Sequence, residues 1–344
     1  MSAKLRIGLL GLTHDHIWDH LPALTASENA ELVAAVDPNE PLLKRVANET
    51  GCRTYESLEQ LADAEELDGV FVYSSNSEGA ELATWAAQQG WHVVIEKPMA
   101  ADLAGADAMV AAARQADVQL LVNWPFAWWP QLQKAIAMVS TGEIGDLWQV
   151  KYRAAHAGPQ ELGCSEYFCD WLFDVELNGG GAMMDYCCYG CILAQVLLGS
   201  PSRVTGIAGR FRKDSLLVED NALIAMQYAR AMATAEASWT QIGKLTSYTT
   251  AIYGSEGTLL VEPRAGGRLL LATAEHPEGE AVAVPAVPLH LQNPIEHLVH
   301  CVRTGEKPQP LCLDRNARDA QEILEAGRLS VLNDRAVSLP LPIV

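Results

Sequence analysis

The first 123 residues alternate short apolar runs with longer amphipathic runs, and this alternation limits the possible folds more than any other feature of the chain. The runs expected to form strands are residues 6–10, 32–37, 69–74, 92–96 and 119–123. Helical periodicity fills the gaps between them, at residues 17–27, 41–50, 79–89 and 103–116. This order is typical of βαβ units around a parallel sheet. We therefore predict an α/β fold that begins with a doubly wound Rossmann domain at residues 1–123.

Residues 124–344 have a different pattern. A turn rich in Trp and Pro leads into a helix that ends near Thr141, and a loop-rich stretch then runs to a glycine triplet at residues 179–181. A helix follows over residues 182–198. The later strand-like runs are residues 222–228, 232–239, 248–253 and 258–261, and the last helices are residues 294–303 and 315–332. We predict a second, α+β domain with an open, mostly antiparallel sheet, whose last helix can pack back on the first domain.

The charge of the chain argues against several classes of partner. Acidic residues number 43 against 24 basic ones, so the formal net charge is -19. This field repels a phosphate backbone and an anionic membrane surface, so we expect no binding to nucleic acid or to membranes. The sequence shows no basic apolar leader and no uninterrupted apolar stretch that could cross a bilayer, which predicts a cytoplasmic protein. Its eight cysteines are expected to be reduced, with Cys188 and Cys191 buried as small apolar residues.

The first loop has the context of a dinucleotide site. A strand leads into Gly11-Leu12-Thr13-His14-Asp15-His16, and a helix follows, so backbone N–H groups at the helix start can hold a pyrophosphate. Only the first glycine of a G-x-G-x-x-G motif is present. Asp37, at the end of the second strand, can accept hydrogen bonds from an adenosine ribose and would repel a 2′-phosphate, which favours NAD over NADP. The alternative for Asp37 is an ordinary turn or helix cap before Pro38.

Three histidines in this region raise the question of a metal site. His16 and His20 are one helical turn apart, and His14 lies two residues before His16. Their spacing matches no closed metal site, so we expect no metal and interpret them as histidines beside a cofactor loop.

Four short motifs carry a family resemblance. They are Glu96-Lys97-Pro98 after a predicted strand, residues 179–189 (GGGAMMDYCCY), Gly8-x-x-Gly11 near the start, and residues 142–145 (GEIG) before a strand. With them, the chain resembles the Gfo/Idh/MocA family of NAD(P)-dependent sugar and cyclitol oxidoreductases. The resemblance covers nearly the whole chain, including the last helix and the tail at residues 339–342.

The resemblance implies roles for individual residues. Lys97 would lie beside the nicotinamide and the reacting hydroxyl, Asp185 would contact substrate, and Tyr189 would be the acid/base where many members have His. It also implies a homodimer or homotetramer formed through the second sheet. We expect cofactor contacts from Gly8, Gly11, Leu12, Thr13, His14, Asp37, Ser74, Asn76, Glu96 and Lys97. We expect substrate contacts from Asn123, Trp124, Trp171 and Asp185.

The chemistry of these residues agrees with those roles. Asp185 and Tyr189 are spaced i and i+4 on a predicted helix, so both side chains point the same way. A phenol with a pKa of about 10 needs a neighbouring cation to titrate usefully, and Lys97 could supply it. Taken singly, Lys97 could be a surface lysine, Tyr189 a core aromatic and Asp185 a residue of a first helical turn.

The chain also departs from the family pattern. Two glycines of the first loop are missing. Ser77 and Gly79 stand after Asn76, where the family usually has a histidine, and Trp124 follows Asn123, where an arginine is common. The sequence therefore defines the fold more clearly than it defines the affinity for the cofactor or the choice between NAD and NADP.

These observations predict an NAD(P)-dependent oxidoreductase that acts on a CH–OH group of a sugar, polyol or cyclitol. Tyr189, assisted by Lys97, would take the hydroxyl proton while NAD accepts a hydride. Trp128 and Trp129 could also stack on a sugar, and Asp170 and Asp174 could bind its hydroxyls. Two alternatives remain open: a redox-neutral NAD-dependent glycosidase or lyase, and a non-catalytic regulator that senses NAD(P) or sugar.

Overall fold

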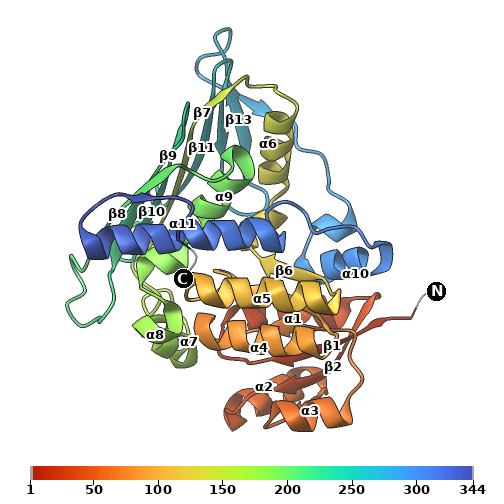
Figure 1. Ribbon diagram of the computed structural model, residues 1–344. Helices are drawn as coiled ribbons and strands as arrows, with labels where there is room; N and C mark the ends of the chain where they lie inside the picture. Colours follow the sequence, from red (N-terminus) through yellow and green to blue (C-terminus); the bar gives the residue numbers. More distant parts are fainter. Residues whose placement is uncertain (1–2, 343–344) are drawn as a thin grey trace.

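The computed structural model describes residues 3–342 and contains two β-sheets with helices around them (Figure 1). The first sheet has six parallel strands in the order β3-β2-β1-β4-β5-β6. Its strands are β1 (Leu5–Leu10), β2 (Ala30–Val36), β3 (Arg53–Tyr55), β4 (Gly69–Val72), β5 (His92–Glu96) and β6 (Leu120–Asn123). The predicted doubly wound parallel sheet is confirmed. The strand order reverses between β1 and β4, which opens a crevice at the carboxyl ends of these strands.

Helices cover both faces of this sheet. They are α1 (His16–Ala26), α2 (Glu40–Thr50), α3 (Leu58–Ala64), α4 (Asn76–Gln88) and α5 (Leu103–Ala116). The predicted ends of the four longer helices agree with these bounds to within three residues. Two elements were not predicted, β3 and α3. They are only three and seven residues long, and β3 is largely exposed, so neither gives a periodic pattern.

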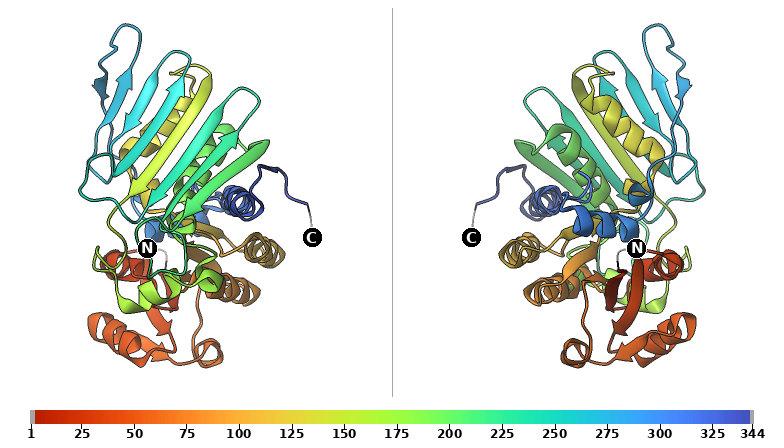
Figure 2. Two further views of the ribbon diagram at one scale, coloured as in Figure 1. Left: turned by 90° about the vertical axis from the view of Figure 1, so that its left-hand side faces the viewer. Right: turned by 90° about the vertical axis from the view of Figure 1, so that its right-hand side faces the viewer.

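The second sheet has nine strands in the order β14-β13-β12-β11-β7-β10-β9-β8-β15. The strands are β7 (Leu147–Ala155), β8 (Arg203–Gly209), β9 (Asn221–Gln227), β10 (Met232–Ser238), β11 (Tyr248–Gly254), β12 (Thr258–Val261), β13 (Leu269–Ala272), β14 (Glu280–Val282) and β15 (Val337–Ser338). Every neighbouring pair is antiparallel except β7 and β10. The predicted open, mostly antiparallel sheet is confirmed. Helices cover one face of it, and the other face is open (Figure 2).

The helices of residues 124–342 differ from the predicted ones at two places. They are η1 (Pro125–Trp128), α6 (Pro130–Ser140), α7 (Glu166–Leu172), α8 (Val175–Asn178), η2 (Met183–Cys187), α9 (Cys188–Leu198), η3 (Leu289–Leu291), α10 (Pro294–Thr304) and α11 (Asp314–Asn333). The short helices α7 and α8 lie within the stretch predicted as loop. The single helix predicted over residues 182–198 is instead a π-helical turn, η2, followed by α9.

The chain returns to the first sheet at its C-terminal end. Ile295, Leu298 and Val299 of α10 join the apolar core that β1 and α1 build. Helix α11 lies along α5 (Figure 1), and the Arg318 guanidinium donates to Asp107 at 2.7 Å. Helix α11 therefore packs between the two sheets and joins them, whereas α10 packs on the first sheet.

One helical stretch is more apolar than we expected from the sequence. Residues 175–198 are long and apolar enough to cross a membrane by length and composition, with a mean hydropathy of 1.4 over the best window. However, 72% of that window is buried inside the fold, as in the core helix of a globular protein. Cys187, Cys188 and Cys191 lie in this stretch, fully buried, and all eight cysteines are free thiols.

Candidate active site

Gly11 directly follows β1 and lies at the crevice. Its φ of +75° is one that side chains rarely adopt, and a Cβ there would lie 3.0 Å from both Ser74 Cβ and the Tyr73 carbonyl oxygen. Glycine therefore lets the chain turn sharply beside β4. The next residues, up to His16 at the start of α1, form the loop that was predicted to hold a pyrophosphate.

Asp37 fixes this loop from the second strand. One carboxylate oxygen accepts the backbone N–H of Leu12 at 2.6 Å, and the other accepts the backbone N–H of Asn39 at 2.7 Å. The side chain is only 2% exposed, and burial raises its pKa despite these hydrogen bonds. Asp37 is thus more than a turn residue, because it joins the first loop to the end of β2.

A cavity of about 560 Å³ adjoins Gly11 and Asp37. Thr13 and Ser74 also line it, and the Thr13 hydroxyl is buried without a hydrogen-bond partner among residues 3–342. A buried, unpartnered hydroxyl at the predicted pyrophosphate position fits a bound phosphate oxygen. Glu56, Glu59, Glu78 and Glu81 line the same cavity, and this concentration of carboxylates disfavours a further phosphate on the ribose. The hydrogen-bonding groups of this cavity and its negative charge fit NAD better than NADP.

Some residues predicted to contact the cofactor do not line this cavity. Gly8 lies inside β1, where a Cβ would be 2.6 Å from Leu67, so its role there is packing. The Leu12 side chain is buried, and this residue offers only its backbone. Asn76 turns towards the second part of the chain and donates to Asn178 Oδ1 at 2.7 Å. His14 is buried behind the loop, against Phe168.

The glycine triplet before Asp185 lets two segments approach closely. A Cβ at Gly179 would lie 2.1 Å from the Ala101 carbonyl oxygen, and one at Gly181 would lie 2.2 Å from the Glu219 carbonyl oxygen. The Glu219 carboxylate accepts the backbone N–H groups of Gly181 and Met183, at 2.7 and 3.0 Å. The η2 turn follows this anchored segment directly and places Asp185 beside Lys97.

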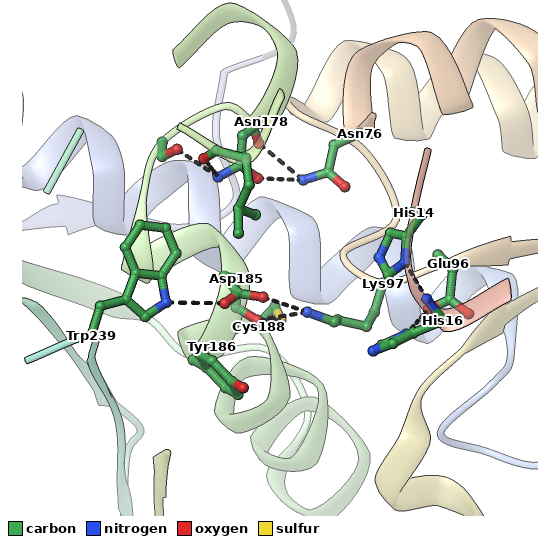
Figure 3. A network of polar contacts seen from close by, with 12 residues as sticks. His14, His16, Asn76, Glu96, Lys97, Asn178, Asp185, Tyr186, Cys188 and Trp239 are labelled. Carbon is green, nitrogen blue, oxygen red and sulfur yellow. Dashed lines mark hydrogen bonds and ion pairs between the residues drawn. The ribbon is translucent and has the colours of Figure 1, made fainter. Parts of the chain in front are cut away.

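Lys97 and Asp185 form a buried ion pair. Lys97 Nζ donates to Asp185 Oδ1 at 2.6 Å and to the Asp185 carbonyl oxygen at 3.1 Å, and Trp239 Nε1 donates to Asp185 Oδ2 at 3.1 Å (Figure 3). Burial alone would lower the pKa of Lys97, but the Asp185 carboxylate outweighs burial and raises it. Lys97 is therefore held as an ammonium group in one position.

Tyr189 lies next to this pair but is not hydrogen-bonded to it. Lys97 Nζ lies 5.3 Å from the centroid of the Tyr189 ring and 5.5 Å from that of Tyr186. Burial raises the pKa of Tyr189 well above its ordinary value, and the neighbouring thiol and carboxylates add to this effect. The sequence suggested that Lys97 would assist the Tyr189 phenol directly. In the structure the ammonium pairs with Asp185 and faces the tyrosine rings.

Lys97, Asp185 and Tyr189 all line a second cavity, of about 660 Å³. Aromatic and hydrogen-bonding side chains form most of its wall, as in sites for small polar ligands. The other lining residues with polar or aromatic side chains are Asp15, His16, Asp19, His20, Phe126, Trp128, Trp129, Tyr152, His156, Phe168, Tyr186, Tyr248 and Arg264. The three predicted catalytic residues are thus brought together in one cavity.

The predicted substrate residues are placed differently. Trp124 and Trp171 are buried, and neither lines the cavity, whereas Trp128 and Trp129 do. Asn123 is buried as well: its amide donates to Glu96 at 2.6 Å, and its oxygen accepts from Trp128 Nε1 at 2.8 Å. Asn123 therefore orients Trp128 instead of lining the cavity.

The two carboxylates that flank Trp171 do not line the cavity either. Asp170 is exposed, and Asp174 caps the short helix α8 by accepting the backbone N–H groups of Glu176 and Leu177. Hydroxyl binding by these two residues therefore has no support in their placement.

Several lining residues were missed by sequence reasoning. Tyr186 lines the cavity from η2, a π-helical turn, and turns of this kind are frequent at functional sites. His156 directly follows β7, and a polar residue at the end of a strand was the one signal that could have identified it. Tyr248 lies in strand β11, and Arg264 lies in a loop. Nothing in the sequence around either residue indicates that it lines the cavity.

Comparison with known protein families assigns both parts of the chain. Residues 5–124 match the family described as "Oxidoreductase family, NAD-binding Rossmann fold". Residues 132–260 match the one described as "GFO/IDH/MocA C-terminal domain". The two matches follow each other in the order of the two sheets and together cover most of the chain.

Individual relatives match along nearly the full length. The chain is 28% identical to the D-apiose dehydrogenase of Paraburkholderia graminis, over 98% of this chain and 89% of that one. It is 27% identical to D-xylose 1-dehydrogenase (NADP(+)) 2 of Haloferax volcanii, over 89% and 91%. Among solved structures, the WlbA dehydrogenase of Bordetella pertussis, in complex with NADH and UDP-GlcNAcA, superposes with a TM-score of 0.83 at 22% identity, over 99% of each chain.

Proposed function

Since the chain belongs to the Gfo/Idh/MocA family of NAD(P)-dependent oxidoreductases, we propose that it moves a hydride between NAD and a CH–OH carbon of a sugar or polyol. The observation that carries this proposal is the buried Lys97–Asp185 pair on the wall of an aromatic cavity beside the dinucleotide crevice. The relatives that oxidise D-apiose and D-xylose support a small carbohydrate as substrate.

Lys97 is the group placed to bind the reacting oxygen. An ammonium has three N–H donors, and two of these go to Asp185. The third can donate to a substrate hydroxyl or carbonyl oxygen in the cavity. A fixed positive charge at this point stabilises the negative charge that develops on the oxygen during hydride transfer. The bound nicotinamide supplies the hydride donor or acceptor.

Tyr189 is the group proposed to exchange the proton. Its ring is fixed by edge contacts with Phe126 at 5.0 Å and Trp124 at 5.7 Å and by a stacked contact with Tyr152 at 5.6 Å, measured between ring centroids. Since burial raises its pKa, the phenol keeps its proton at neutral pH. It therefore suits proton donation during carbonyl reduction, whereas alcohol oxidation requires it to lose that proton first.

The pH dependence of the two directions is expected to differ for this reason. The pKa values of Lys97 and Tyr189 are both raised, so both groups stay protonated through neutral pH. Oxidation needs a deprotonated acceptor, so kcat for oxidation should rise about tenfold per pH unit from pH about 7 to pH about 9. Reduction should change little over the same range. Steady-state profiles in both directions check this, and a plateau in the oxidation profile from neutral pH would contradict the assignment.

We also propose that the open face of the nine-stranded sheet forms a homo-oligomer interface. Ile207, Met232 and Leu260 on β8, β10 and β12 are 60%, 48% and 38% exposed. Figure 2 shows that no helix of residues 3–342 covers this face of the sheet. Exposed apolar side chains on three strands of such a face favour contact with a second copy. Light scattering during gel filtration should give a dimer or tetramer, and Ile207→Glu with Met232→Glu should shift it towards the monomer. A wild-type monomer at micromolar concentration contradicts this interface.

A substrate screen tests the proposed function itself. Aldoses, polyols and cyclitols are incubated with enzyme and NAD, and reduced cofactor is followed by absorbance at pH about 9, where oxidation is expected to be faster. At least one aldose or polyol should give sustained NADH formation, and the same substrate with NADP should give less. If the protein binds NAD but no carbohydrate produces NADH, net oxidation of a sugar is wrong for this chain.

A further inference from the structure

Three histidines that the proposed hydride transfer does not use gather around one carboxylate. Glu96, at the end of β5, accepts from His16 Nδ1 at 2.8 Å, and its other oxygen lies 3.7 Å from His20 Nδ1. The ring centroids of His14 and His16 are 4.5 Å apart. One ligand atom each from His14, His16 and Glu96 all lie within 4.8 Å of one another. Figure 3 shows these three side chains together, next to Lys97.

His14 provides a second, independent observation. It is only 1% exposed, and its Nε2 has no hydrogen-bond partner among residues 3–342. Its other ring nitrogen, Nδ1, lies 3.2 Å from the backbone N–H of His16. A buried ring nitrogen without a partner calls for an explanation, and a bound ligand would supply one.

The Glu96 carboxylate is held in position by a further hydrogen bond. Asn123 Nδ2 donates to Glu96 Oε1 at 2.6 Å, and the Glu96 side chain is 5% exposed. Glu96 is thus a buried carboxylate beside three imidazoles, and a cation bound between these groups would pair with it.

We propose that His14, His16 and Glu96 bind a divalent transition-metal ion. Two imidazoles and one carboxylate form the donor set of catalytic zinc sites and of non-haem iron sites, which both keep open coordination positions. The first loop and the end of β5 provide the three ligands from two rigid elements. This site is additional to the proposed hydride transfer, which requires no metal.

The position of the site indicates what the ion would bind. His16 and His20 line the 660 Å³ cavity together with Lys97 and Tyr189, so an open coordination position can face the substrate. An oxygen of a vicinal diol or of an α-hydroxycarbonyl group could then bind the ion as Lewis base, while Lys97 holds the reacting oxygen.

Binding through His14 Nε2 has a structural consequence. A metal-bound Nε2 requires the remaining ring proton to be on Nδ1, which now faces the His16 backbone N–H. The 3.2 Å contact should therefore lengthen when the ion binds. The backbone amide of His16 and the ring nitrogens of His14 should change their NMR chemical shifts more than those of distant histidines.

The test uses the full chain without a histidine tag, freed of metal by chelation and titrated with Co²⁺ and then Zn²⁺. We expect one equivalent of Co²⁺ with visible d–d absorption, displaced by one equivalent of Zn²⁺. Calorimetry should give a Zn²⁺ affinity that falls at least tenfold in His16→Gln and in Glu96→Gln, since loss of even an outer-shell partner costs 10- to 100-fold. His14→Gln should also weaken binding.

His300→Gln is the matched control, because His300 Nε2 pairs with Glu306 at 2.9 Å on the surface. This variant should bind Co²⁺ and Zn²⁺ like the wild type. Circular dichroism and NAD binding are measured on each variant, to distinguish loss of the metal site from misfolding. The change in the His16 amide chemical shift is measured in the wild type and so does not depend on any variant. No Co²⁺ absorption, or equal Zn²⁺ affinity in wild type, His16→Gln and Glu96→Gln, would overturn the proposal.

Discussion

Replacing Lys97 by methionine is expected to lower kcat at least a thousandfold and to leave NAD affinity within about threefold of the wild type. Methionine keeps an unbranched stem but removes the ammonium that is placed to bind the reacting oxygen. The side chain is nearly fully buried and paired with Asp185 at 2.6 Å, so water cannot replace its charge. Steady-state kinetics and calorimetry with NAD measure the two quantities separately.

The same substitution should also destabilise the protein. Removing one partner of a buried ion pair leaves the other charge unpaired, which typically costs about 3–5 kcal/mol. The double variant Lys97→Met with Asp185→Leu should regain much of that stability but none of the activity. Lys134→Met serves as control, because Lys134 pairs with Glu143 at 3.7 Å at the surface. Activity within tenfold of the wild type in folded Lys97→Met protein is incompatible with the proposed role of Lys97.

Replacing Asp37 by alanine is expected to weaken NAD binding about 30- to 100-fold and to affect NADP much less. The carboxylate holds the Leu12 backbone at 2.6 Å, and its position beside the cavity suits a ribose diol. Hydrogen bonds to a charged group are worth about 1.5–3 kcal/mol, or roughly 10- to 150-fold in affinity, and the expected loss lies within this range. Without Asp37, the cavity also has one negative charge less to repel a 2′-phosphate.

Calorimetric titration of each variant with both dinucleotides measures this effect. Asp214→Ala removes the same charge at an exposed position and should leave both affinities unchanged. The ratio of NAD to NADP affinity is the decisive quantity, because a general loosening of the first loop would weaken both cofactors equally. An unchanged ratio in Asp37→Ala would show that other groups select the cofactor.

The first domain could be predicted from the sequence because most strands of its sheet are buried on both faces and its longer helices are regular. Four of the six strands of the first sheet are apolar along almost their whole length, so each stands out from the amphipathic helices around it. The elements that were missed are short. Helix α8 has four residues, and its start depends on a cap from Asp174, which no periodic pattern records.

The candidate site was predictable where motif residues occur at the ends of elements. Lys97 follows β5 and Asp185 follows a glycine triplet, and these positions converge in the structure. The tryptophans show the limit of such reasoning. Trp124 and Trp128 lie in one turn, and only the way that η1 packs decides that Trp124 points into the core and Trp128 towards the cavity.

The histidine cluster could not be predicted for a different reason. The spacing of His14, His16 and His20 alone resembles no metal site, and the fourth member, Glu96, is 80 residues away from His16 in the chain. Only the pairing of β1 with β4 and of β4 with β5 brings the first loop and the end of β5 together. Contacts of this kind follow from strand order, which a single sequence does not specify.

Deuterium transfer tests the central claim most directly. A sugar that carries deuterium on all its carbons is turned over with NAD, and the mass of the released cofactor is measured together with the amount of sugar oxidised. We predict one deuterium in each molecule of released NADH, with an equal amount of oxidised sugar. Consumption of the sugar without release of deuterated NADH would contradict net hydride transfer and would identify a redox-neutral reaction that keeps its cofactor bound.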